Sequence, residues 1–72
     1  MVWANIRANT ETWFKKQPVS LEYLPDNQKI LVEQGVKLFR TQVLERKEEH
    51  THVEFGKEKE SWWLITNHWD GL

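Results

Sequence analysis

Two strand-like runs separated by a short charged connector constrain the fold of this chain most. The first run, over residues 50–55, alternates apolar with polar side chains and ends at Gly56. A period of two with β-branched and aromatic residues is typical of a half-buried strand. The charged residues 57–60 follow, and then a second run over 61–66 that is rich in aromatic and branched side chains. Together the two runs predict a β-hairpin with an exposed tip.

A third strand-like segment spans residues 36–44, and Phe39 interrupts its alternation. Val36 and Leu38 stand at even-numbered positions, whereas the branched residues after Phe39, Thr41 and Val43, stand at odd-numbered positions. A bulge or sharp bend near Phe39 restores the phase. Such a bend suits a small barrel, whose long strands must curl.

The segment 24–35 carries two competing signals. Asp26 is a residue type that caps helices, and Gly35 is one that ends them. Against a helix, Ile30 and Val32 are β-branched and stand at strand spacing. A short strand is favoured here, and a short helix is the alternative.

The N-terminal part gives weaker signals. Residues 10–17 predict an edge strand, because Pro18 disfavours continuation of either a helix or a ladder. Residues 1–9 are expected to form a poorly ordered tail, with one domain over residues 10–72. Three side chains of the following loop are expected to plug one end of the core: Leu21, Tyr23 and Leu24.

These segments predict an all-β protein in which five to six short antiparallel strands form a small barrel. With 72 residues, the chain forms at most one compact domain and buries about 60% of the surface that its unfolded state exposes. The alternative is an α+β fold in which residues 26–34 form one short helix on a three-stranded antiparallel sheet.

The chain has five tryptophans, which is more than a core of this size buries completely: Trp3, Trp13, Trp62, Trp63 and Trp69. Large rings supply apolar area to a small core, and exposed rings form contact platforms. Trp62 and Trp63 are adjacent, so in a strand they point to opposite faces. We therefore predict a partner-binding patch that uses Tyr23, Trp62, Trp63 and Trp69. A protein partner or a second copy of the chain is the first choice of ligand, and a cell-wall glycan is the second.

Charge and motifs argue against several function classes. The formal net charge of −1 gives no overall positive field for a nucleic-acid backbone, so a single-stranded nucleic acid is a less favoured ligand. The sequence has no Gly-rich phosphate loop, nucleophile elbow or HExxH pattern, and we expect no enzymatic activity and no cofactor. His50 and His52 share one strand face and are weak candidates for a metal site, although ordinary polar surface is favoured.

Two further properties concern location. The chain has no cysteine, which excludes disulfides and thiolate zinc sites. Its start lacks the apolar segment of a signal peptide, and no apolar run reaches the roughly 20 residues that span a bilayer. We expect no membrane insertion and a cytoplasmic location for the chain as written, or a secreted or cell-wall location if it is part of a longer protein.

Four short motifs follow one another along the chain. The first two are Trp13-Phe14-Lys15-Lys16 and Leu24-Pro25-Asp26 with Lys29, Val32 and Gly35. The last two are His50 with Val53 and Phe55, and Trp62-Trp63 with Ile65, His68 and Trp69. In this order the motifs resemble small SH3-like β modules that accompany cell-wall hydrolases in cyanobacteria and their phages. The resemblance covers roughly residues 13–69 and implies a compact SH3-like barrel that assists attachment or assembly and performs no chemistry. No hydrolase domain stands beside it in this sequence.

Overall fold

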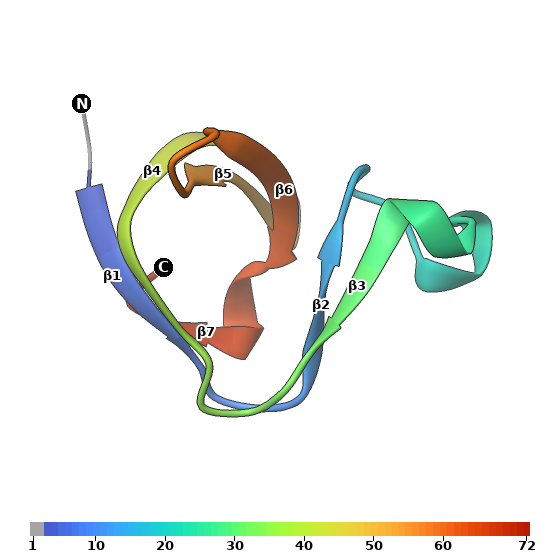
Figure 1. Ribbon diagram of the computed structural model, residues 1–72. Helices are drawn as coiled ribbons and strands as arrows, with labels where there is room; N and C mark the ends of the chain where they lie inside the picture. The colour runs from blue at the N-terminus through green and yellow to red at the C-terminus, as the bar shows by residue number, and fades with distance from the viewer. Residues whose placement is uncertain (1–2) are drawn as a thin grey trace.

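The strands of this protein form one curled antiparallel sheet, seen in a computed structural model that describes residues 3–72 (Figure 1). The strands are β1 (Trp3–Ala8), β2 (Thr12–Lys15), β3 (Lys29–Val32), β4 (Lys37–Lys47), β5 (His50–Phe55), β6 (Glu60–Ile65) and β7 (Trp69–Asp70). Three single 3-10 turns complete the described part: η1 (Leu21–Tyr23), η2 (Asp26–Gln28) and η3 (Thr66–His68). The all-β prediction is confirmed.

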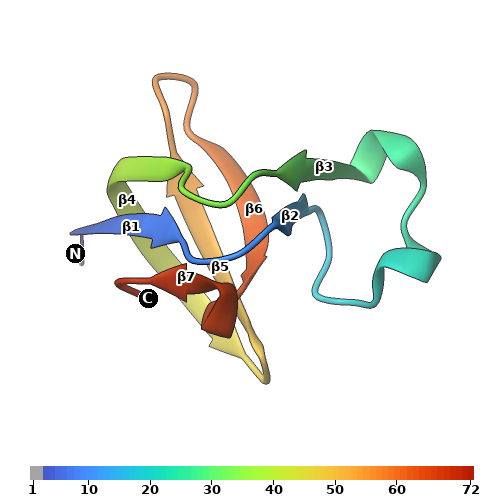
Figure 2. The ribbon, with the colours of Figure 1, turned by 90° about the horizontal axis from the view of Figure 1, so that it is seen from below.

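The strand order is β3-β2-β6-β5-β4-β1-β7. The strands from β6 to β7 wrap around a common interior, whereas β2 and β3 form an arm that extends to one side (Figures 1 and 2). The end strands β3 and β7 are not paired with each other, so the sheet is curled but not closed. No helix in the described part of the chain is long and apolar enough to cross a membrane.

The segment 24–35 contains a strand and not a helix. A 3-10 turn over Asp26–Gln28 leads directly into β3, so the α+β alternative with a helix over residues 26–34 is wrong. β3 pairs with β2 along its whole length. The prediction of an edge strand at residues 10–17 is wrong in its placement, because β2 lies between β3 and β6 and β3 is the edge.

The N-terminal segment is part of the sheet. The sequence predicts a tail over residues 1–9, but Trp3–Ala8 forms β1, which pairs with both β4 and β7. Ile6 and Ala8 are buried in the core. Residues 1–2 of the expected tail lie outside the described residues.

A bulge interrupts the pairing of β1 with β4 at the position that the alternation predicted. Ala4 pairs with Thr41 and Ile6 pairs with Leu38, so the single residue Asn5 faces two residues of β4. The second of these two, Arg40, has a positive φ of 54°, a conformation that lets one extra residue fit into a strand. The Arg40 backbone N–H donates a hydrogen bond of 3.1 Å to Asn5 Oδ1. The predicted bulge near Phe39 is confirmed.

The core fills the interior of the curled sheet. Its buried members are Ile6, Ala8, Val32, Val53, Trp62, Leu64 and Trp69. Phe14 packs against them and stacks on Trp69, with ring centroids 5.9 Å apart and an interplanar angle of 12°. Large rings supply much of the apolar area here, because each buried aromatic side chain removes roughly 150–250 Å² from water.

Candidate binding face on strands β1 and β4

The predicted tryptophan patch is not an exposed surface. Trp62, Trp63 and Trp69 are 6%, 8% and 3% exposed, whereas Tyr23 is 74% exposed. Strand alternation does send Trp62 and Trp63 to opposite faces, but the face of Trp63 is covered as well. Trp63 stacks on His52 with ring centroids 4.5 Å apart and an interplanar angle of 7°. Of the four predicted side chains, Tyr23 alone is available to a ligand.

A buried amine lies beside Trp63 on this covered face. Lys15 is opposite Trp63 in the β2–β6 pair and is 4% exposed. Its Nζ donates hydrogen bonds to the carbonyl oxygen of Val19 at 3.0 Å and to His50 Nε2 at 3.2 Å. Burial lowers the pKa of Lys15. Burial, followed by the positive charge of Lys15, lowers the pKa of His50, so His50 accepts this hydrogen bond as a neutral imidazole.

The two histidines considered as metal ligands have other contacts. His50 is hydrogen-bonded to Lys15, and His52 is stacked on Trp63. Within residues 3–72, no group of three or more histidine, cysteine, aspartate or glutamate side chains is placed to hold a metal ion. The two side chains therefore join the packing of this face.

The lowered pKa of His50 predicts that the folded state loses stability as the pH falls below 6.5. The unfolded chain takes up a proton near the ordinary pKa of 6.5, and the folded chain resists it because its pKa is lower. Stability is therefore complete above that pH and decreases as the pH falls through it. Urea unfolding at pH 7.5, 6.5 and 5.5 measures the effect. His50→Gln, which keeps a hydrogen-bond acceptor, should flatten the dependence, and equal slopes for both proteins would contradict the assignment.

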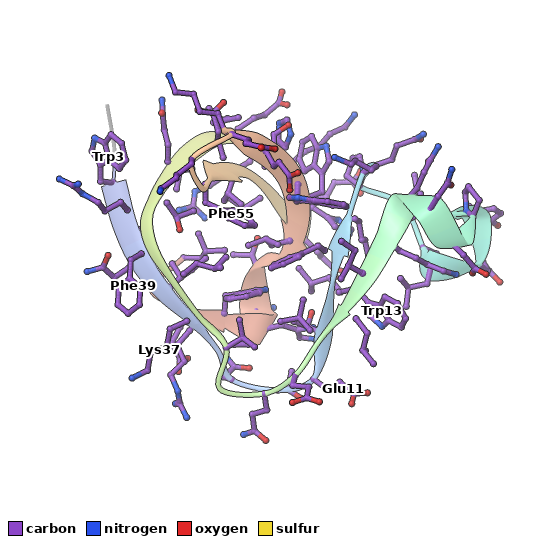
Figure 3. The ribbon with its side chains drawn as sticks, viewed as in Figure 1. Trp3, Glu11, Trp13, Lys37, Phe39 and Phe55 are labelled. Carbon is purple, nitrogen blue, oxygen red and sulfur yellow. The ribbon has the colours of Figure 1, made fainter. Side chains whose placement is uncertain are left out.

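A different surface presents aromatic rings to solvent. Trp3 and Phe39 are 58% and 66% exposed, and both project outward from β1 and β4 (Figure 3). The core-facing residues of these strands, such as Ile6 and Leu38, take the opposite side of the sheet. Phe39 follows the core-facing Leu38, so strand alternation turns it outward, and the extra residue in the bulge of β4 returns Thr41 to the core side.

Basic side chains surround the two rings. Arg7 is paired with Lys37 on β4 and with Asp70 on β7, so the three share the outer face. Arg40 belongs to the bulge itself. No salt bridge within the described part of the chain involves any of these four residues. The cations are therefore available for a charged ligand. We call Trp3, Arg7, Lys37, Phe39 and Arg40 the β1–β4 face.

Two shallow hollows flank the bulge on this face. One, of about 270 Å³, is lined by Phe39, Arg7, Lys37 and Asp70 among others. The other, of about 170 Å³, has Trp3 and Arg40 in its wall together with Phe55 and Lys59. Each hollow thus combines at least one aromatic side chain with two cations and one carboxylate, Asp70 in the first and Glu54 in the second. Such an arrangement can stack on flat rings of a ligand and donate charge-assisted hydrogen bonds to its acidic groups.

Comparison of the chain with protein-family models, with curated proteins and with solved structures finds no match.

Proposed function

We propose that the protein is a non-catalytic, SH3-like binding module and that the β1–β4 face is its ligand site. The observation that carries the proposal is the exposure of two large rings, Trp3 at 58% and Phe39 at 66%, on one outer sheet face. Burying such rings against a ligand is favourable, and exposed aromatic side chains are enriched where ligands dock. The surrounding strands are held by the core, so the rings stand on a rigid support.

The ligand class that this face suits best is an extended glycan chain that carries carboxylates, as cell-wall peptidoglycan does. Sugar rings stack on flat aromatic side chains, and the cations that line the same hollows, Arg7, Lys37 and Arg40, can bind acidic groups of such a ligand. The hollows are shallow, which suits a chain lying along the surface more than a small molecule enclosed in a pocket. The resemblance to modules that accompany cell-wall hydrolases supports the same class. This proposal corresponds to a cell-wall location for the module.

Co-sedimentation with purified peptidoglycan sacculi tests the proposal. Trp3→Ala combined with Phe39→Ala should weaken retention by about tenfold or more, because a stacking ring contributes roughly 1–3 kcal/mol. Tyr23→Ala is the matched control, since it removes a ring that is even more exposed from another part of the surface. Retention of the double variant at the wild-type level would contradict the proposal. So would retention that falls only with Tyr23→Ala.

A second experiment distinguishes nucleic-acid binding from glycan binding. A fluorescent oligothymidylate is titrated at low and at physiological salt, because backbone binding weakens steeply with salt. Binding of the oligonucleotide without retention on sacculi would assign the rings to base stacking and overturn the glycan proposal.

A protein partner is the second candidate function. The observation that favours it is the edge of β3 that pairs with no strand of the described residues, where Ile30 and Leu31 are 48% and 49% exposed. This edge is separate from the β1–β4 face.

A further inference from the structure

The arm formed by β2 and β3 ends in an open strand edge. β3 pairs with β2 on one side and with no strand of residues 3–72 on the other. The arm projects from the curled part of the sheet (Figure 2). Unpaired edges with apolar side chains are sites at which another strand adds to a sheet.

The hydrogen-bond register shows which backbone groups of β3 face outward. The Lys16 N–H donates to the carbonyl oxygen of Gln28 at 3.0 Å. In an antiparallel pair, hydrogen-bonded and non-hydrogen-bonded residue pairs alternate. The backbone groups of Ile30 and Val32 are therefore hydrogen-bonded to the residues opposite them in β2. Leu31 lies between these two residues, so its N–H and C=O groups point away from β2. The N–H and C=O groups of Lys29 also point away from β2.

We propose that β3 pairs antiparallel with β3 of a second copy of this chain, around a twofold axis at Leu31. In this register Leu31 lies opposite Leu31 of the partner subunit, with each donating to and accepting from the other. Ile30 lies opposite Val32 of the partner subunit, which covers the half-exposed Ile30. Both copies contribute the same edge, which gives the self-complementary interface that twofold symmetry requires.

Among axes that pass through Lys29, Leu31 or Glu33, charge selects the one through Leu31. When the pairing extends one residue past the end of β3, Lys29 lies opposite Glu33 of the partner subunit, and the twofold axis repeats this pair of opposite charges. Centring the axis on Lys29 would bring two ammonium groups together, and centring it on Glu33 would bring two carboxylates together. Opposite charges across a strand pair stabilise it and like charges destabilise it. The sequence from Lys29 to Glu33 is thus complementary to itself in the antiparallel direction.

The side chains at this edge are free to make the contact. Glu33 is exposed and takes part in no salt bridge of the described residues. Lys29 Nζ makes long contacts within the chain, 3.9 Å to Asp26 Oδ1, 3.4 Å to the carbonyl oxygen of Leu21 and 5.9 Å to the centroid of the Trp13 ring. On the same face as Leu31 lies Trp13, its partner in β2, which extends the apolar contact. β3 lies on the opposite side of the molecule from β1 and β4 (Figure 1), so this inference does not depend on the proposed function.

Sedimentation equilibrium over about 5 μM to 1 mM tests the proposal with the full chain. A short edge-to-edge contact is small, so we expect reversible dimerisation with a Kd in roughly the micromolar to millimolar range. Glu33→Lys should raise the Kd by about tenfold, because it sets a lysine opposite Lys29 at both symmetric positions. Lys29→Glu combined with Glu33→Lys should bring the Kd back to within about threefold of wild type, because the pair is reversed but complementary.

A third variant keeps the test decisive if the charge changes disturb the nearby loop. Leu31→Lys sets two ammonium groups against each other at the axis while leaving the hydrogen bonds to β2 in place, and it should abolish the dimer. Far-UV circular dichroism of each variant checks that the fold is retained. A wild-type chain that stays monomeric throughout the range would overturn the proposal. A dimer that is unaffected by Glu33→Lys and Leu31→Lys would overturn it as well.

Discussion

Replacing Leu64 with alanine should leave the protein mostly unfolded at 25 °C. Leu64 is fully buried, at 0% exposure, in the middle of the core. Truncation of a buried leucine costs about 2–5 kcal/mol, because apolar contacts are lost and a cavity remains. A single core in a chain of this size supplies only about 3–5 kcal/mol of net stability. The cost of the substitution is therefore comparable to the entire free energy of unfolding.

Urea unfolding followed by circular dichroism measures this effect. Leu44→Ala is the matched control, because it removes the same atoms from a side chain that is 43% exposed. We expect it to change the free energy of unfolding by about 0.5 kcal/mol or less. A Leu64→Ala protein that unfolds within about 1 kcal/mol of wild type would contradict the assignment of Leu64 to the core.

The second large effect is expected at Gly71, just after β7. Gly71 has a φ of +97°, and a Cβ added there would stand 2.6 Å from the backbone oxygen of Asn5. Backbone atoms in a paired strand have little room to move, so Gly71→Ala must either strain the bulge or detach the C-terminus. We expect a loss of about 2–3 kcal/mol of stability, the sum of backbone strain and steric overlap.

Gly35→Ala is the control that separates the two causes. Gly35 has a similar φ of +93°, but nothing lies within 4 Å of an added Cβ. Its substitution should cost about 1 kcal/mol, the strain of the left-handed backbone alone. The difference between the two urea midpoints then measures the overlap with Asn5. Equal costs at both positions would show that the C-terminus moves freely away from β1.

Much of the fold could be predicted because its signals are local. The alternation over residues 50–55, the turn at Gly56 and the apolar run after it specify the β5–β6 hairpin. The phase break at Phe39 predicted a bulge because strand periodicity leaves no other way to keep both halves facing the core. The first strand was missed although Ala4, Ile6 and Ala8 stand at alternate positions. Alanine is depleted in strands, so the signal was weak.

The binding face was harder to predict because exposure is decided by distant segments. Nothing near Trp63 in the sequence indicates that His52 covers its ring. Trp3 belongs to the segment for which the sequence predicts a tail, and its exposed position follows from the pairing of β1 with β4. Phe39 was recognised as a break in a pattern, and that break is the signal that could have identified it as an outward-facing ring.

Fluorine NMR of the protein labelled with 5-fluorotryptophan tests the central claim most directly, because each of the five tryptophans gives its own resonance. A Trp3→Phe variant assigns the resonance of Trp3, and soluble peptidoglycan fragments are then titrated into the labelled protein. The β1–β4 face predicts that the Trp3 resonance moves with added fragment, while the resonances of the buried Trp62, Trp63 and Trp69 stay in place. Shifts at the buried tryptophans with no change at Trp3 would contradict it.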